Sequence, residues 1–162
     1  MKTITLIRHA KSSWEFNLPD YERPITPNGK INTQKIATAY LPFFDPTTVI
    51  WCSSATRTKQ TASVFLKTIN STDEPVVYKK ELYTFDYSSF LQTIQSIPDA
   101  IHKIIIFGHN NALTDFINHH SNTNIENLPT SALVTIEFQA QTWNTIGRGN
   151  VINRIFPKDL PL

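Results

Sequence analysis

The chain alternates between short runs of β-branched and apolar residues and segments whose apolar residues recur every three or four positions. The first kind is typical of buried strands, and the second is typical of helices with one buried face. Helix-like spacing follows each of the strand-like runs, which cover residues 3–7, 48–51, 76–78 and 104–107. This order predicts an α/β fold, a three-layer α/β/α sandwich with a mostly parallel central sheet.

The end of the chain and the overall composition fit one domain. Residues 133–138 and 151–156 alternate like strands, which leaves room for an antiparallel edge of the sheet. No repeat, low-complexity tract or Gly/Ser linker divides the 162 residues, of which 40% are hydrophobic and 17% charged. We therefore expect residues 1–162 to form a single domain with one core.

Charge and cysteine content exclude several function classes. The formal net charge is +2 and the basic residues are scattered, so the sequence supports neither a nucleic-acid partner nor a membrane surface. The first apolar run is cut by Arg8 after four residues, which is too short for a signal peptide or a membrane span, and we expect a soluble, cytoplasmic protein. Cys52 is the single cysteine, so an internal disulfide and multi-cysteine metal sites are excluded.

Cationic residues and histidines follow three of the predicted strands. Arg8 and His9 end the first strand, Arg57 lies just after the second, and His109 ends the most hydrophobic one. Parallel strands bring their carboxyl ends to one edge of a sheet, which is where such sheets bind ligands. Helix starts after Arg57 and His109 would add backbone N–H groups there. Two guanidiniums and two imidazoles at one edge fit a phosphoryl group.

For each of these residues taken alone, a structural role is a simpler explanation than a functional one. One histidine at a strand end is usually a satisfied structural residue, and a single arginine is usually a solvated surface charge. Three strand ends that all carry such groups are hard to attribute to burial, because each placement would desolvate charge without a compensating role. The combination therefore favours a phosphate site.

The sequence around these positions resembles the histidine phosphatase superfamily, which has the phosphoglycerate mutase-like fold. Residues 6–14 (LIRHAKSSW) resemble the family's signature, and residues 23–29 (RPITPNG) resemble its turn into the first helix. Residues 53–62 and 106–110 are similar to its Ser-x₃-Arg…Gln-Thr-Ala and second-histidine motifs. The four motifs occur in the family's order, and the short chain looks like the SixA-like phosphohistidine phosphatases.

The resemblance implies a role for each matched residue. His9 would be the nucleophile that forms a phosphohistidine intermediate, and Arg8, Arg57 and His109 would clamp the phosphoryl oxygens. A neutral imidazole is a competent nucleophile, and two arginines supply the charge neutralisation that a metal provides elsewhere. We therefore expect neither a metal nor another cofactor, and we expect a phosphate ion to bind in the pocket.

The sequence departs from the wider family around the two histidines. Ala10 replaces the usual glycine, Lys11 stands where mutases carry a glutamate, and Asn110 stands where phytases carry an aspartate acid. Glu81 is similar in position to the acid of the mutase branch, and it is equally explained as a solvated glutamate beside two lysines. A strong general acid would be less necessary for a phosphohistidine substrate, because imidazole is a better leaving group than an alkoxide.

Further residues are expected to contact the substrate. Trp14 is close enough to His9 in sequence to line the mouth of the pocket, and Ser12, Asn110 and Ser131 are counted with the substrate-binding residues. The predicted function is hydrolysis of phosphohistidine on a protein. The alternatives are a phosphomonoesterase acting on a small molecule and a non-catalytic phosphoprotein-binding module.

Overall fold

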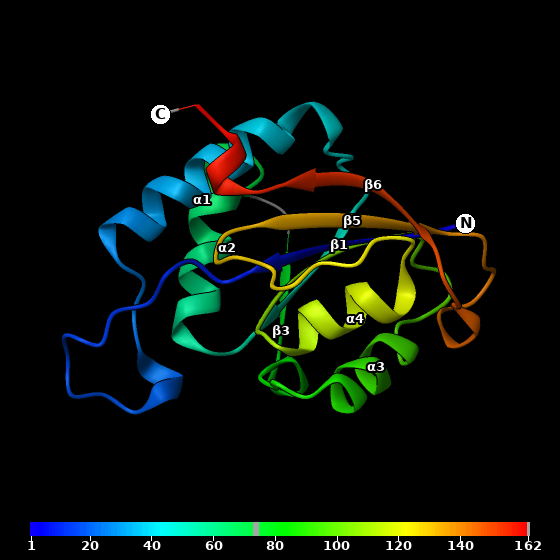
Figure 1. Ribbon diagram of the computed structural model, residues 1–162, viewed down its shortest axis with the longest axis horizontal. Helices are drawn as coiled ribbons and strands as arrows, with labels where there is room; N and C mark the ends of the chain where they lie inside the picture. The colour runs from blue at the N-terminus through cyan, green and yellow to red at the C-terminus, as the bar shows by residue number, and fades with distance from the viewer. Residues whose placement is uncertain (73–74, 162) are drawn as a thin grey trace.

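The structure, a computed structural model, describes residues 1–72 and 75–161. Its centre is a six-stranded sheet in the order β3-β2-β4-β1-β5-β6 (Figure 1). The strands are β1 (Lys2–Arg8), β2 (Val49–Ser53), β3 (Val76–Lys79), β4 (Lys103–Gly108), β5 (Leu133–Phe138) and β6 (Asn150–Ile155). Strands β1 to β4 are parallel, as the alternating sequence pattern predicted.

Helices cover both faces of the sheet, which confirms the predicted three-layer architecture. The helices are α1 (Pro27–Tyr40), α2 (Thr56–Thr68), α3 (Tyr87–Gln95) and α4 (Ala112–His120). Helices α1 and α2 pack on one face, and α3 and α4 pack on the other, the lower side in Figure 1. Alternate residues of β4 therefore enter different cores, with Ile104 and Ile106 on the α3/α4 side and Ile105 and Phe107 on the α1/α2 side.

The antiparallel strand of the sheet is β5, which lies next to the edge strand rather than at the edge itself. Strand β5 pairs antiparallel with both β1 and β6, so β6 forms the edge and runs in the same direction as β1. The Thr5 and Thr135 hydroxyls, which face each other across β1 and β5, are 2.9 Å apart and buried. Strand β1 is thus enclosed between β4 and β5, and the strand that carries Arg8 is held on both sides.

Local sequence signals begin two of the helices. The Thr26 hydroxyl accepts a hydrogen bond from the Gly29 amide at 3.0 Å, and Pro27 is the first residue of α1. Asp86 caps α3 by accepting from the Ser89 amide at 2.9 Å. Of the helices in the described ranges, none is both long and apolar enough to cross a bilayer.

Candidate active site

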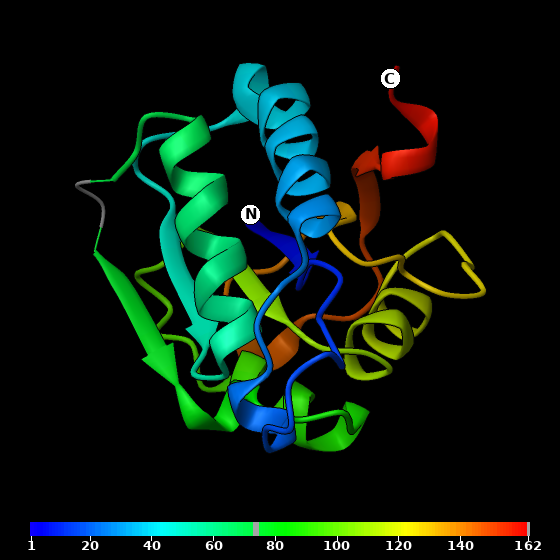
Figure 2. The ribbon, with the colours of Figure 1, turned by 90° about the vertical axis from the view of Figure 1, so that its left-hand side faces the viewer.

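A cavity of about 370 Å³ opens at the carboxyl ends of the parallel strands. It is lined by Arg8, His9, Lys11, Ser12, Trp14, Arg23, Arg57, Phe85, His109, Asn110 and Thr130. Arg8 pairs with Gly108 in the register of β1 and β4, so the residues after them, His9 and His109, meet at this edge with ring centroids 5.3 Å apart. Figure 2 looks toward this edge, with the loop of residues 9–26 crossing its front.

His9 is buried with one ring nitrogen committed to the backbone. Its Nδ1 lies 2.7 Å from the Ala10 carbonyl oxygen, which can only accept, so Nδ1 carries the hydrogen. Burial lowers the pKa of His9 from 6.5 to about 4; the hydrogen bond to Ala10 opposes this, and the positive charges of Arg57 and Arg8 add to it. At neutral pH the ring is uncharged, with its Nε2 lone pair free to attack.

The backbone after His9 is fixed by the first two helices. The Ala10 amide donates to the Thr61 hydroxyl at 2.8 Å, and that hydroxyl donates to the Arg57 carbonyl at 2.7 Å. Gly29 of α1 packs so closely that a Cβ there would lie 2.8 Å from the Lys11 carbonyl oxygen. Ala10 is fully buried in this contact, which accommodates its methyl group in place of the glycine usual at this position.

His109 is a neutral hydrogen-bonding group. Its Nε2 lies 2.8 Å from the Ser53 hydroxyl, and that hydroxyl accepts from the Ala55 amide at 3.3 Å. The Ser53 proton is available for Nε2, and in the tautomer that accepts it the ring hydrogen lies on Nδ1 as a donor. Burial, then His9 and Arg57, lower the pKa of His109 to about 2, so it stays uncharged at neutral pH.

Arg8 and Arg57 are each anchored through Nη1. The Arg8 Nη1 donates to the Leu128 carbonyl at 2.9 Å, and the Arg57 Nη1 donates to the Asp20 carbonyl at 2.7 Å. Arg57 lies in the first turn of α2, which begins one residue earlier than Arg57 rather than after it. Burial lowers the pKa of Arg8, and the positive charge of Arg57 lowers it further.

Unpaired buried donors gather around this cavity. Within residues 1–72 and 75–161, four buried side-chain polar atoms lack a hydrogen-bond partner: Arg8 Nε, Ser54 Oγ, Arg57 Nε and His109 Nδ1. Three of these atoms belong to cavity-lining residues. Buried polar groups are nearly always paired in folded proteins, so donors left together in this way indicate a site built for an acceptor-rich ligand. A tetrahedral oxyanion is such a ligand.

Arg23 and Asp20 belong to the site but were not predicted for it. Arg23 is buried and lines the cavity; its Nη2 donates to the Ser12 hydroxyl at 2.7 Å, and its guanidinium lies 3.1 Å from the Trp14 ring centroid. It is the first residue of the segment 23–29 that resembles the family's turn into the first helix, and this resemblance is the sequence signal that could have identified it. Asp20, in the 3₁₀ segment η1 (Asp20–Glu22), binds Arg57 from behind the cavity and gave no signal in the sequence.

The other predicted site residues divide into two groups. Ser12, Trp14 and Asn110 line the cavity, with Trp14 78% exposed at its mouth. Glu81 lies in the 3₁₀ segment η3 (Lys80–Leu82), is exposed and does not line the cavity. Ser131 is also outside the lining, although it was counted with the substrate-binding residues.

Ser131 supports the site from below instead. Its hydroxyl pairs with the Thr33 hydroxyl at 2.9 Å, so it is engaged with α1. Its amide donates to the carbonyl oxygens of Arg8 and His9, both at 3.1 Å, and the residue adopts a left-handed φ of 64°. Asn110 acts in a similar way: its side chain donates to the Leu128 carbonyl at 3.0 Å, the same oxygen that anchors Arg8.

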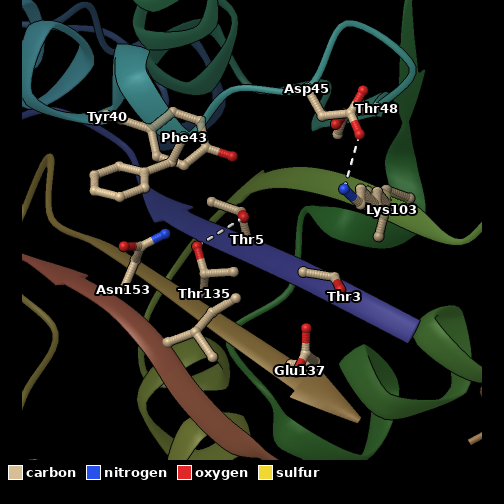
Figure 3. A pocket seen from close by; sticks show the side chains of 12 residues that line it. Thr3, Thr5, Tyr40, Phe43, Asp45, Thr48, Lys103, Thr135, Glu137 and Asn153 are labelled. Carbon is tan, nitrogen blue, oxygen red and sulfur yellow. Dashed lines mark hydrogen bonds and ion pairs between the residues drawn. The ribbon is translucent and has the colours of Figure 1, made fainter. Parts of the chain in front are cut away.

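A second, smaller cavity of about 110 Å³ lies at the opposite, amino-terminal ends of the strands (Figure 3). Lys103, a cation in its lining, is paired with Asp45 at 2.8 Å, and Glu137 adds a second carboxylate. Among the described residues, its lining contains no histidine and carries an excess of negative charge, so it is a poor site for a phosphoryl group. In the part of the chain that the structure describes, no three His, Cys, Asp or Glu side chains gather as a metal-binding group.

Solved structures with the same fold include phosphatases of different substrates. A chain from Agrobacterium tumefaciens assigned as the phosphohistidine phosphatase SixA is 22% identical, with a TM-score of 0.75 over 96% of this chain and 98% of that one. The protein histidine phosphatase SixA complexed with tungstate is 16% identical, with a TM-score of 0.80 over 97% and 98%. The mycobacterial glucosyl-3-phosphoglycerate phosphatase Rv2419c is 9% identical, with a TM-score of 0.65 over 93% and 97%. These likenesses confirm the predicted phosphoglycerate mutase-like fold.

Sequence comparison identifies the family. Two uncharacterized proteins of Mycobacterium tuberculosis, MT1313 and Rv1276c, are each 30% identical over 107 residues, or 64% of this chain. The matched part spans only 62% of the length of these relatives. Residues 4–99, more than half of the chain, match the model of the histidine phosphatase superfamily (branch 1). The chain therefore belongs to the histidine phosphatase superfamily.

Proposed function

We propose that this chain is a metal-independent phosphatase that hydrolyses phosphohistidine on a protein through a phosphorylated His9. The observation that carries the proposal is the set of unpaired buried donors on Arg8, Arg57 and His109 around a neutral histidine. The donors suit the non-bridging oxygens of a phosphoryl group, and the free Nε2 of His9 suits attack on its phosphorus.

In the first step the His9 Nε2 lone pair attacks phosphorus. A bond forms between Nε2 and phosphorus, and the bond from phosphorus to the leaving group breaks, with its electron pair going to that group. Nδ1 keeps its hydrogen and its bond to the Ala10 carbonyl, which spreads the positive charge that develops on the ring. Arg8 and Arg57 stabilise the charge on the flattened phosphoryl group more strongly than that on the ground state.

In the second step water attacks the phosphorylated His9. The new bond from water oxygen to phosphorus replaces the bond from Nε2, which regains its lone pair, and the water proton leaves with the phosphate product or to solvent. The low pKa of His9 favours departure of the ring as a neutral imidazole. The enzyme returns to its starting tautomer without a metal or another cofactor.

The lining of the cavity favours a leaving group that needs no strong acid. Among the described residues, no carboxyl group lines the cavity, and Glu81 lies outside it. Asp20 is ionised at neutral pH, since its pKa is about 2. A phosphorus–nitrogen bond to imidazole breaks with less acid assistance than an ester, so phosphohistidine fits this site better than an alkyl phosphate.

The mouth of the cavity favours a protein over a metabolite. Trp14 and Phe85 line the cavity and are 78% and 50% exposed. The loop that carries Trp14 also exposes Phe16, Leu18 and Tyr21. Exposed apolar groups around a site commonly mark a protein contact. A small phosphomonoester remains the alternative substrate, because the shared fold also occurs in a glucosyl-3-phosphoglycerate phosphatase. A binding module without catalysis would have no use for the free Nε2 of His9.

The test is to trap the phosphoenzyme with labelled substrates, with His9→Ala compared against His102→Ala, which removes an exposed histidine at the other end of the sheet. We expect label on the wild type and on His102→Ala, none on folded His9→Ala, and unchanged turnover in EDTA. A phosphorylated histidine domain should be turned over faster than small phosphate esters. Persistent activity in His9→Ala would refute the mechanism, and preference for small esters would refute the substrate.

A further inference from the structure

Asp20 connects the cations of the cavity to the wall behind them. Its main-chain carbonyl accepts from Arg57 Nη1 at 2.7 Å, and its carboxylate Oδ2 accepts from Arg57 Nη2 at 3.0 Å. Oδ2 also accepts from the Tyr83 hydroxyl at 2.6 Å, and Oδ1 accepts from Arg23 Nη1 at 3.3 Å. Asp20 is not itself among the cavity-lining residues, so it acts on groups that are.

The contacts use one particular edge of the Arg57 guanidinium. Asp20 takes the end formed by Nη1 and Nη2 with two acceptors, while Nε has no partner. A guanidinium has five N–H groups in a rigid plane, so fixing its end also fixes the direction of the side edge formed by Nε and Nη2. Arg8 shares part of this arrangement, since its Nη1 alone is held, by the Leu128 carbonyl, and its Nε is unpaired in the described residues.

We propose that Asp20 is a positioning residue, which holds the Arg57 guanidinium so that its Nε–Nη2 edge is presented to the transferred phosphoryl group. The inference rests on the proposed phosphatase function and adds to it a residue that does not touch the substrate. The fork of Arg57 is then preorganised before substrate arrives, so its donors need no reorientation as charge develops on the phosphoryl oxygens.

The negative charge of Asp20 is part of this role. Burial opposes ionisation of the carboxyl, but the hydrogen bonds from Tyr83 and Arg57 outweigh it and hold the pKa of Asp20 at about 2. In the described ranges, Asp20 is the one carboxylate paired with the cavity's arginines, since Arg57 and Arg23 both form ion pairs with it. It offsets the repulsion among cations gathered for an anion.

Tyr83 links Asp20 to two other parts of the site. Its ring meets His109 edge-on with centroids 5.4 Å apart, and it meets Tyr21 of η1 in the same way at 5.0 Å. Asp20 is thus held to the segment before α3 as well as to α2, and the loop crossing the front of the site is fixed at this point (Figure 2). The carboxylate that anchors Arg57 is therefore connected to the His109 ring through Tyr83.

The test is a double-mutant cycle with Asp20→Ala, Arg57→Ala and the double variant. Asp20→Ala should lower single-turnover phosphoenzyme formation by roughly 10- to 100-fold. In the Arg57→Ala background, the fold loss caused by Asp20→Ala should be smaller by roughly tenfold or more, because the effects of groups that act through one another are not additive. Asp20→Asn, which keeps an acceptor without the charge, should recover part of the loss. Asp45→Ala, which removes a carboxylate paired with Lys103 at 2.8 Å far from the site, should leave the rate unchanged.

Two outcomes would overturn the inference. Equal fold losses with and without Arg57 would mean that Asp20 acts on stability or on another group, and faster turnover in Asp20→Ala would mean that it holds Arg57 away from the substrate. The affinity for inorganic phosphate should show the same coupling when it is measured by calorimetry on the wild type and the three variants of the cycle. A wild type that forms no phosphoenzyme, yet shows coupled phosphate binding, would refute the proposed function and retain the role of Asp20.

Discussion

The Nδ1 hydrogen of His9 is donated to the carbonyl oxygen of the next residue, Ala10, over 2.7 Å. This bond fixes the tautomer of the ring, and burial lowers the pKa of His9 to about 4. We expect the ¹⁵N resonances of His9 to remain those of the neutral Nδ1–H form from pH 7 down to about pH 5. A His9→Ala sample assigns the signals. A titration midpoint near 6.5 would show that the ring is not desolvated as the structure has it.

The lowered pKa of His9 also predicts how stability depends on pH. In the unfolded chain the imidazole takes up a proton below its ordinary value of 6.5, whereas in the folded chain it does so only near 4. The unfolded state therefore binds more protons between these values, and the free energy of unfolding falls as the pH is lowered from 6.5 toward 4. Urea unfolding of His9→Asn should show a smaller fall than that of wild type or of His102→Asn, which replaces an exposed histidine. Equal slopes in all three proteins would contradict the prediction.

Arg57 is predicted to act as a two-donor fork and not as a point charge. Arg57→Ala should reduce turnover roughly 10²- to 10³-fold, as for other transition-state donors. Arg57→Lys should be nearly as slow, because an ammonium lacks the planar fork that binds Asp20 through Nη1 and Nη2 and presents an Nε–Nη2 edge at the same time. Steady-state kinetics of both variants decide the matter. Near-normal turnover in Arg57→Lys alone would mean that charge suffices, and near-normal turnover in both would place Arg57 outside the reaction.

Gly29 is predicted to matter for catalysis although it lies on a helix away from the cavity. A Cβ at this position would meet the Lys11 carbonyl oxygen at 2.8 Å and the Ala10 Cβ at 3.1 Å, so Gly29→Ala must push on the backbone next to His9. We expect turnover to fall by about 10- to 100-fold and stability by about 1–3 kcal/mol. Gly147→Ala is the matched control, since a Cβ there meets nothing within 4 Å. Equal, small effects of the two substitutions would argue against the close contact.

The residues that were correctly predicted to line the cavity share one property, which is their position at or shortly after the carboxyl end of a strand. Arg8 is the last residue of β1, and His9 and His109 directly follow β1 and β4. Hydrophobic periodicity locates strand ends well enough to predict that these residues meet. Fold class and strand boundaries were predictable for the same reason. Arg57 was found through its place after β2, although it lies inside the first turn of α2.

The residues that the sequence missed or misplaced depend on irregular backbone. Asp20 reaches Arg57 from a loop with no periodicity, so no pattern relates the two positions. Ser131 turns through a left-handed conformation that presents its amide, not its hydroxyl, to the end of β1. Glu81 occupies a short 3₁₀ turn whose direction follows from packing of its neighbour Leu82, which is fully buried. Contacts of this kind are set by tertiary packing rather than by local sequence.

The enclosure of β1 between β4 and β5 has a consequence for synthesis of the protein. Both neighbours of this strand come from residues 103–138, so β1 leaves the ribosome about a hundred residues before its first strand partner. Pairings so distant along the chain form slowly, and an unpaired apolar strand is prone to aggregate in the meantime. The nascent amino-terminal half would therefore depend on late-made residues for protection, and chaperones that bind extended apolar segments should associate with it until β5 has emerged.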